Sequence, residues 1–386
     1  MTALQSRLGH ELSGAGASSG AYVYDISDKQ VLFSAHPTVR RAPASVEKLY
    51  TATTALELMG PSARLQTTVL GVGHLSSGVW EGNLYLRGGG DPTFGSSAFI
   101  AAHYGGVGAS VSALASQLAS AGIHRVSGKI LGDDSFLDPL PGEPSSNYRP
   151  DPFLEGTLSA LAFNRGQAGS LHGTHAPAAY AAHELWVALR AKHIAAPAGS
   201  GTALTPAGAA QLALVASPTV TELLGLTLPP SDNFFAETLL KDLGARFGGS
   251  GSTATGAALV SKTIGTYFGL SPRVVDGSGL SEADHTSPYE VVDLLAELYP
   301  TSLGEVLRSD LAIAAQTGTL SERMRHTVAA GRCEGKTGTL TGVSNLVGYC
   351  QTVAGQELAF AFFTDNISTF AAHVIQDKMT ISIAGY

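Results

Sequence analysis

A serine stands three residues before a lysine in the segment Ser45-Val46-Glu47-Lys48. Serine becomes a nucleophile when a neighbouring base removes its proton, and a lysine serves as that base when burial or a nearby cation lowers its pKa. Residues three apart share one face of a helix, so Ser45 and Lys48 come within hydrogen-bonding reach if a helix begins here. The alternative is structural: Ser45 only caps the helix and Lys48 extends toward solvent.

Two further motifs follow in the order that this chemistry needs. The segment PPSDNFFAE places Ser231 and Asn233 at alternate positions, in a loop that enters a helix. The segment EGKTGTLTG supplies a cation at Lys336, a hydroxyl at Thr337 and a glycine at Gly338 that lets a substrate approach a strand closely. A fold that brought the three motifs together would surround one serine with hydroxyl and cationic groups, which favour an alkoxide and an anionic substrate.

The ordered motifs S-x-x-K, S-x-N and K-T-G resemble those of the penicillin-binding protein and serine β-lactamase superfamily. Four longer segments resemble one branch of it, the D-alanyl-D-alanine carboxypeptidase/endopeptidases of peptidase family S13, also called class C low-molecular-mass penicillin-binding proteins. These segments are GGGDPTF at 88–94, SDNFFAETLLK at 231–241, DGSGLS at 276–281 and KTGTLTGVSNLVGY at 336–349.

The resemblance implies a role for each motif residue. Ser45 would be the acylated nucleophile, Lys48 its general base, and Ser231 the group that passes the proton to the leaving amine. Asn233 would bind the substrate amide, and Lys336 would keep the site positively charged. Thr337 and Thr339 would bind the substrate carboxylate. Backbone N–H groups of Ser45 and Thr339 would form the oxyanion hole.

The segment GDDSFLD at 132–138 lies where members of the family contact the free amine of the peptide. Asp133 or Asp134 is therefore a candidate for that contact, and the alternative is that both cap a turn. The family often has a basic residue after GSGLS, whereas this chain continues with Glu282 and Asp284. We expect the two acidic residues to alter how that loop packs.

The length of 386 residues favours two domains. Apolar residues at helical spacing predict a buried helix from about Ser45 to Met59, ended by Gly60-Pro61, after two short antiparallel strands joined near Ser27-Asp28-Lys29. Near residue 62 the pattern changes to strand-like runs with glycine-rich turns, and near residue 217 it returns to strongly helical segments. We expect an α/β (α+β) fold: residues 1–62 and 217–386 form a transpeptidase-like domain with an antiparallel sheet flanked by helices, and 63–216 form a sheet-containing insert. The second inserted domain of larger family members is reduced or absent.

Charge and hydropathy exclude several classes of partner. A net charge of -8 without a Lys/Arg-rich run argues against nucleic acid. No apolar stretch has the roughly 18 residues of a membrane-spanning helix, and the N-terminus lacks the apolar core of a signal peptide. The resemblance implies an extracytoplasmic enzyme without a cofactor, which acts on peptidoglycan peptides and is acylated by β-lactams. Its signal peptide would be absent from this sequence, and its oligomeric state is open.

The two cysteines, Cys333 and Cys350, are symmetric about Thr341-Gly342. A hairpin centred there would bring them together either as a disulfide or as buried thiols.

Three rival functions remain. His172, His175 and His183 suggest a zinc-dependent peptidase, although His183-Glu184 is not followed by the second histidine of an HExxH motif. A serine β-lactamase or esterase of the same fold is nearer, but no E-x-x-L-N segment supplies the second carboxylate for rapid deacylation. A β-lactam sensor without turnover is the third.

Overall fold

The computed structural model describes residues 2–167, 176–197 and 199–386, which form two compact units. The first unit holds the chain up to Pro61 together with Thr221–Asp232 and Ala257–Tyr386. The second holds Ser62–Val220 and Asn233–Gly256. The sequence analysis assigned the whole of 217–386 to the catalytic part, whereas here 217–220 and 233–256 belong to the second unit.

The first unit is built on a six-stranded antiparallel sheet in the order β2-β1-β12-β11-β10-β9. Its strands are β1 (Gly20–Asp25), β2 (Gln30–Ala35), β9 (Ala312–Ile313), β10 (Cys333–Leu340), β11 (Val343–Gln351) and β12 (Glu357–Asp365). The first and last segments of the chain therefore meet in one sheet, because β1 pairs with β12. The expected hairpin at the start of the chain is present as β1 and β2.

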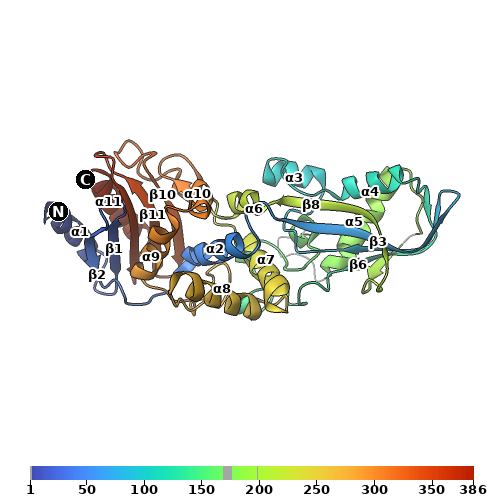
Figure 1. Ribbon diagram of the computed structural model, residues 1–386, viewed down its shortest axis with the longest axis horizontal. Coiled ribbons are helices and arrows are strands. Elements are labelled where there is room, and N and C mark those ends of the chain that lie inside the picture. The colour runs from blue at the N-terminus through green and yellow to red at the C-terminus, as the bar shows by residue number, and fades with distance from the viewer. Residues whose placement is uncertain (1, 168–175, 198) are drawn as a thin grey trace. The chain divides into compact units, whose positions relative to one another are not determined.

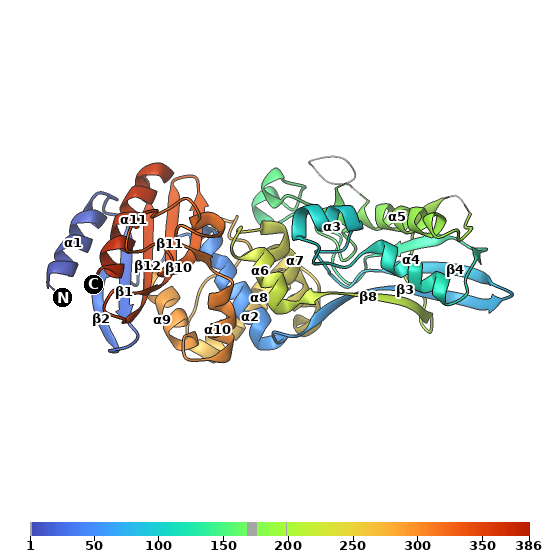
Figure 2. The ribbon, with the colours of Figure 1, turned by 90° about the horizontal axis from the view of Figure 1, so that it is seen from above.

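Helices cover both faces of this sheet. Helices α1 (Thr2–Ser13) and α11 (Thr369–Ala384) pack on one face, where their apolar side chains join a single core with the strands (Figure 2). Helix α9 (Pro288–Leu298) covers the other face, and the hydroxyl of Tyr349 in β11 donates to its Leu295 carbonyl at 2.7 Å. The other helices that belong wholly or mainly to this unit are α2 (Lys48–Leu58), α6 (Val220–Thr227), α8 (Thr253–Phe268) and α10 (Ser302–Ser309). The predicted antiparallel sheet flanked by helices is confirmed (Figure 1).

Burial along the strands follows from this cover. Positions 344–350 of β11 and 358–364 of β12 are buried without interruption, as expected for strands packed on both faces. Strand β1 alternates more because it lies nearer the edge of the sheet. Strands β10 and β11 form the hairpin expected from the two cysteines, and Cys333 lies opposite Cys350. The two are joined as a disulfide.

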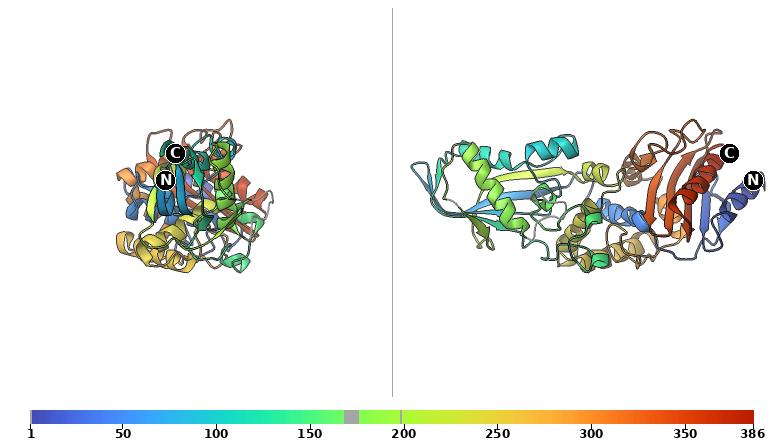
Figure 3. Two further views of the ribbon diagram at one scale, coloured as in Figure 1. Left: turned by 90° about the vertical axis from the view of Figure 1, so that its right-hand side faces the viewer. Right: turned by 180° about the vertical axis from the view of Figure 1, so that it is seen from behind.

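The second unit has its own sheet, in the order β7-β6-β4-β3-β8, with β5 beside β4. Pairings of β3 with β4 and β8 are antiparallel, whereas β4 pairs with β5 and β6, and β6 with β7, in parallel. The strands are β3 (Arg64–Ser76), β4 (Val79–Arg87), β5 (Arg125–Val126), β6 (Ile130–Asp133), β7 (Ser200–Thr202) and β8 (Ala210–Thr219). The apolar sides of helices α4 (Val111–Ser120) and α5 (Pro177–Ala191) are buried against this sheet. The right-hand view of Figure 3 shows the green helix α5 lying across the strands, and α3 (Ser97–Tyr104) is a further helix of this unit.

Helix α7 (Asn233–Leu243) belongs to the second unit because its buried side chains are held there. The ammonium group of Lys241 is 2.7 Å from a carboxylate oxygen of Asp138 and donates to the Leu140 carbonyl at the same distance. The ring of Phe235 contacts Tyr104 edge to face. These contacts join residues that are far apart in the sequence, so the local residue pattern does not reveal them. For this reason the sequence analysis assigned this helix to the catalytic domain.

No helix in the described part of the chain combines the length and apolar character needed to span a membrane.

Candidate active site

Ser45 and Lys48 lie at the start of the buried helix that the sequence predicts. A 3-10 turn, η1 (Ala44–Glu47), precedes α2. The ammonium nitrogen of Lys48 lies 2.9 Å from the hydroxyl of Ser45 and 2.7 Å from the Ser278 carbonyl, to both of which it donates. Lys48 is only 1% exposed. The structural alternative is therefore wrong, because Lys48 is buried and the caps of η1 and α2 are Pro43 and Glu47, neither with a side-chain capping hydrogen bond.

The backbone just before Ser45 is strained and tightly packed. Ala44 has a φ of 49°, in the left-handed region that alanine rarely adopts. Two glycines from distant segments press against it. A Cβ on Gly338 would lie 2.4 Å from the Pro43 carbonyl oxygen, and a Cβ on Gly279 would lie 1.9 Å from that of Ala44. The close approach that Gly338 permits is thus to this backbone, which fixes the position of Ser45; the sequence analysis had assigned it to a substrate.

Lys336 connects the second and third motifs. It lies in β10, is 1% exposed, and donates to the hydroxyl of Ser231 at 2.8 Å and to the Thr337 carbonyl at 2.9 Å. Burial and the nearby Lys48 lower the pKa of Lys336 well below its ordinary value. Ser231 lies in the loop before α7 and has a φ of 67°, a left-handed backbone conformation that residues with a side chain rarely adopt. Three of the predicted residues, Lys48, Lys336 and Ser231, are therefore gathered close to one another in the first unit.

Thr337 and Thr339 occupy alternate positions of β10 and so point to the same side of the strand. The hydroxyl of Thr337 donates to that of Thr319 at 2.8 Å, whereas Thr339 is exposed. Strand β9 pairs with β10 only at Glu334 and Gly335. From Lys336 onward, β10 therefore forms an edge of the described sheet, where an extended peptide can add its backbone hydrogen bonds.

Asn233 is the first residue of α7 and belongs to the second unit. Its side-chain amide donates to the Phe153 carbonyl at 2.8 Å. It directly follows Asp232, the last residue of a segment of the first unit, and is two residues after Ser231. The S-x-N motif thus spans the point where the chain passes from one unit to the other.

Asp133 and Asp134 are held by neighbours within the second unit. The carboxylate of Asp133 accepts from the backbone and hydroxyl of Ser135 and from the Thr205 N–H. Burial raises the pKa of Asp133, but these hydrogen bonds outweigh it and leave the pKa below its ordinary value. Asp134 accepts from the Ser159 hydroxyl at 2.9 Å. One oxygen of Asp133 therefore caps the turn at Ser135, as in the turn-capping alternative, and the other accepts from the distant Thr205.

Sequence reasoning missed several residues that contact the motif residues or the backbone beside Ser45. The side-chain amide of Asn345 donates to the Ala42 and Pro43 carbonyls at 3.0 and 2.9 Å, and so holds the strained segment before Ser45. Thr319 accepts from Thr337. Ser278, in the DGSGLS segment, supplies the carbonyl that Lys48 contacts. Hairpin symmetry about Thr341-Gly342 could have placed Asn345 opposite Gly338, but not shown which backbone its amide reaches.

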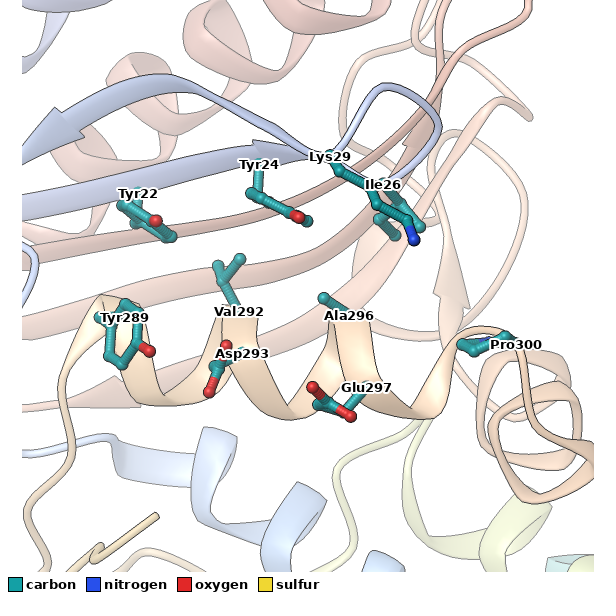
Figure 4. Close-up of a pocket in the computed structure, with 10 residues that line it drawn as sticks. All are labelled: Tyr22, Tyr24, Ile26, Lys29, Tyr289, Val292, Asp293, Ala296, Glu297 and Pro300. Carbon is teal, nitrogen blue, oxygen red and sulfur yellow. The ribbon is translucent and has the colours of Figure 1, made fainter. Parts of the chain in front are cut away.

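A groove of about 660 Å³ lies elsewhere in the first unit, between β1 and α9 (Figure 4). Tyr22 and Tyr24 of β1 face Tyr289, Asp293 and Glu297 across it. None of the motif residues lines this groove, so it is separate from the cluster around Ser45.

The zinc alternative finds no support in the part of the chain that the structure describes. There, no group of three or more His, Cys, Asp or Glu side chains is arranged to hold a metal ion. His183 stacks on Trp186 in α5. His172 and His175 lie outside the described residues.

Comparison with known proteins gives the family. The model of the D-Ala-D-Ala carboxypeptidase 3 (S13) family matches residues 4–147 and 155–385. The chain belongs to this family. It is 27% identical to a D-alanyl-D-alanine carboxypeptidase of Actinomadura sp. (strain R39), over 96% of this chain and 82% of the relative. As a member of the family, the protein is a D-Ala-D-Ala carboxypeptidase, and the enzyme class predicted from the motifs is confirmed.

Solved structures show the same fold. Penicillin-binding protein 4 of Haemophilus influenzae matches with a TM-score of 0.80 and 19% identity, over 98% of this chain and 99% of that one. A penicillin G-acylated predatory endopeptidase of Bdellovibrio bacteriovorus, in complex with an immunity protein, matches with a TM-score of 0.56 and 16% identity, over 94% and 90% of the two chains. The predicted penicillin-binding-protein fold of this S13 member is thus confirmed.

Proposed function

We propose that this S13 carboxypeptidase acts through an acyl-enzyme on Ser45, with Lys48 as the general base. The observation that carries the proposal is the 2.9 Å separation of the Lys48 nitrogen and the Ser45 hydroxyl, in a buried setting where the lysine touches little water. In its neutral form Lys48 takes the hydroxyl proton while the Ser45 oxygen attacks the carbonyl of the penultimate D-alanine. The C–N bond to the last D-alanine then breaks, and water later hydrolyses the ester.

Ser231 and Lys336 supply the proton to the leaving amine. Lys336 donates to the Ser231 hydroxyl at 2.8 Å, which leaves the hydroxyl proton free to point toward the departing nitrogen. The lowered pKa of Lys336 supports this role, because burial and the nearby Lys48 disfavour the charged form of its amine and so make its proton easier to give up.

The oxyanion hole is formed by the backbone N–H groups of Ser45 and Thr339. Its support is the close packing at Gly338, where a Cβ would lie 3.2 Å from the Ser45 nitrogen. A side chain at this position would push β10 away and separate the two donors. The glycine therefore keeps both N–H groups near one carbonyl oxygen, as stabilisation of a tetrahedral intermediate requires.

Substrate recognition uses the open edge of β10. Thr337 and Thr339, on one side of the strand, bind the terminal carboxylate of the peptide, and Lys336 adds positive charge. Asn233 binds the substrate amide once the peptide is in place. We assign the unit that contains Ser45 to catalysis and the second unit to the inserted domain, and we give Asp133 and Asp134 no catalytic role.

The partners are the stem peptides of peptidoglycan, and β-lactams acylate the same serine. The family and the penicillin-acylated relative support this assignment. The Cys333–Cys350 disulfide supports an extracytoplasmic location, because disulfides persist in oxidising compartments.

The test is the preference for a free carboxylate. We expect kcat/KM for a peptide ending in D-Ala-D-Ala to exceed that for its C-terminal amide by about ten- to a hundredfold, the value of a charge-assisted contact. Thr337→Val should reduce this preference, and Thr266→Val, at an exposed helical threonine, should leave it unchanged. Equal rates for acid and amide in the wild type would exclude carboxypeptidase recognition at β10 and favour an esterase or endopeptidase.

A further inference from the structure

The loop Asp276–Ser281 packs against the segment that carries Ser45 and Lys48. The Ser278 carbonyl accepts from the Lys48 nitrogen at 2.7 Å, and the Gly277 carbonyl accepts from the Thr51 hydroxyl of α2 at 3.2 Å. Gly279, with a φ of 80°, packs so closely on the Ala44 carbonyl that no side chain fits there. The backbone of this loop therefore determines where the Lys48 nitrogen is held.

The carboxylate of Asp276 holds the loop in shape. One oxygen accepts from the backbone N–H groups of Ser278 and Gly279 at 3.1 and 2.6 Å, and the other from that of Ser281 at 2.7 Å. Asp276 is fully buried. A buried carboxylate is stable when several backbone N–H groups donate to it, and here these groups are the ones that shape the loop.

Asp284 is a second buried carboxyl against the first. One of its oxygens accepts from the backbone N–H groups of Val275 at 2.5 Å and of Asp276 at 3.3 Å, and its other oxygen is buried and accepts no hydrogen bond from the described residues. Two adjoining buried carboxyls cannot both be ionised at acceptable cost, so one keeps its proton and donates it to the other. The backbone donors on Asp276 favour its charged form, whereas the unpaired buried oxygen of Asp284 is the place where a proton meets the Asp276 carboxylate. Burial and the Asp276 charge raise the pKa of Asp284, which agrees with this assignment.

We propose that Asp276 and Asp284 form a proton-sharing pair that positions Lys48 for catalysis, by holding the Ser278 carbonyl against its nitrogen. The proposal rests on the function assigned to Lys48 above. Neither aspartate is placed against substrate, so both are positioning residues. Asp284 acts as a hydrogen-bond donor, and Asp276 as an acceptor for three backbone N–H groups and for Asp284.

The two roles predict opposite outcomes for the same isosteric change. Asp284→Asn keeps a donor toward Asp276 and an oxygen for the Val275 and Asp276 N–H groups, so the loop should keep its shape. Asp276→Asn replaces one acceptor oxygen with a donor, which then faces a backbone N–H or Asp284. An unmet buried donor of this kind is destabilising, and the loop should rearrange to relieve it.

The experiment measures acylation by benzylpenicillin under single-turnover conditions, which separates the dissociation constant of the initial complex from the acylation rate constant. We expect D276N to lower the rate constant by about tenfold or more and D284N to change it by less than about threefold, with the dissociation constant nearly constant in both. The matched control is D25N, at a fully buried carboxylate that accepts from the Asp28 N–H and from Gln356 in the same unit. It should lower the melting temperature but leave the rate constant unchanged.

Three results would overturn the positioning pair. They are equal rate constants for D276N and the wild type, a loss in D284N as large as that in D276N, and a loss in D25N that matches D276N at equal loss of stability. Failure of the proposed function looks different, because the wild type itself would then not be acylated at Ser45.

Discussion

Asn345 lies opposite Gly338 in the β10–β11 hairpin, and its amide nitrogen donates to two consecutive carbonyls, those of Ala42 and Pro43. Gly338 lies so close to the same Pro43 carbonyl that a Cβ on it would be 2.4 Å from the oxygen. The two cross-strand partners therefore hold one short segment, the strained backbone immediately before Ser45. The nucleophile is thus positioned by β10 and β11 as well as by its own helix.

Asn345→Asp removes both donated hydrogen bonds at constant size. A carboxylate next to two carbonyl oxygens is repelled, so we expect a loss of about 2 kcal/mol or more in unfolding free energy and a slower acylation of Ser45. Urea unfolding and acylation by a fluorescent penicillin measure the two effects. Asn83→Asp is the matched control, because Asn83 accepts from the Lys129 N–H through its oxygen, which the substitution keeps. If N345D unfolds and acylates like N83D, the amide does not hold this segment.

Gly338→Ala should disable acylation. The new Cβ would meet a backbone oxygen at 2.4 Å, so β10 must move away from Pro43 and Ser45, and with it the Thr339 N–H. We expect a fall of about a hundredfold in the acylation rate, as for loss of an oxyanion donor. Gly9→Ala is the control, since a Cβ on this helical glycine would lie 3.9 Å from the nearest atom, in the side chain of Phe33. Normal acylation in G338A would show that the close packing is not needed.

Lys336→Met should abolish turnover and yet stabilise the protein near neutral pH. Because burial and Lys48 lower the pKa of Lys336 in the folded state, folding is penalised at every pH below the ordinary lysine pKa, most fully below the lowered value. Removing the amine removes this penalty, so the gain in unfolding free energy should shrink as pH rises toward about 10.4.

The control for this substitution is Lys241→Met, which breaks a buried ion pair with Asp138 and should destabilise the protein. The measurement is chemical unfolding of both variants across neutral to alkaline pH. A loss of stability in K336M as large as in K241M would mean that Lys336 contributes to folding, contrary to our account.

The Cys333–Cys350 disulfide should contribute to stability without contributing to chemistry. It closes a hairpin loop with a sequence separation of 17, for which the chain-entropy estimate is about 3 kcal/mol. Cys333→Ser with Cys350→Ser should therefore lower the unfolding free energy by about 2 to 4 kcal/mol and keep acylation measurable. Urea unfolding with and without reductant tests this, with thiol titration to verify reduction. Reductant should shift the wild type but not the double variant, and an unshifted, fully reduced wild type would contradict the prediction.

Local spacing predicted what depends on local geometry. The contact between Ser45 and Lys48 follows from their separation along one turn, and the pairing of Cys333 with Cys350 follows from hairpin symmetry. The contact between Lys336 and Ser231 joins residues 105 apart and was expected only from the resemblance.

The rest depends on packing between distant segments. The assignment of α7 to the second unit is decided by contacts such as that between Lys241 and Asp138, which no local pattern displays. Asp276 and Asp284 illustrate the same limit within a motif that sequence reasoning had already identified. Their proximity and full burial, which make one of them a donor, appear only once the loop is folded.

The central claim, that Ser45 is the acylated nucleophile, is tested most directly by intact-mass analysis after mixing with benzylpenicillin, followed by peptide mapping. The account predicts a mass gain of a single penicillin, located on the peptide that carries Ser45, and no gain in Ser45→Ala. Lys48→Ala should give the same product orders of magnitude more slowly. Label on another residue, or undiminished label in the Ser45→Ala variant, would contradict the account.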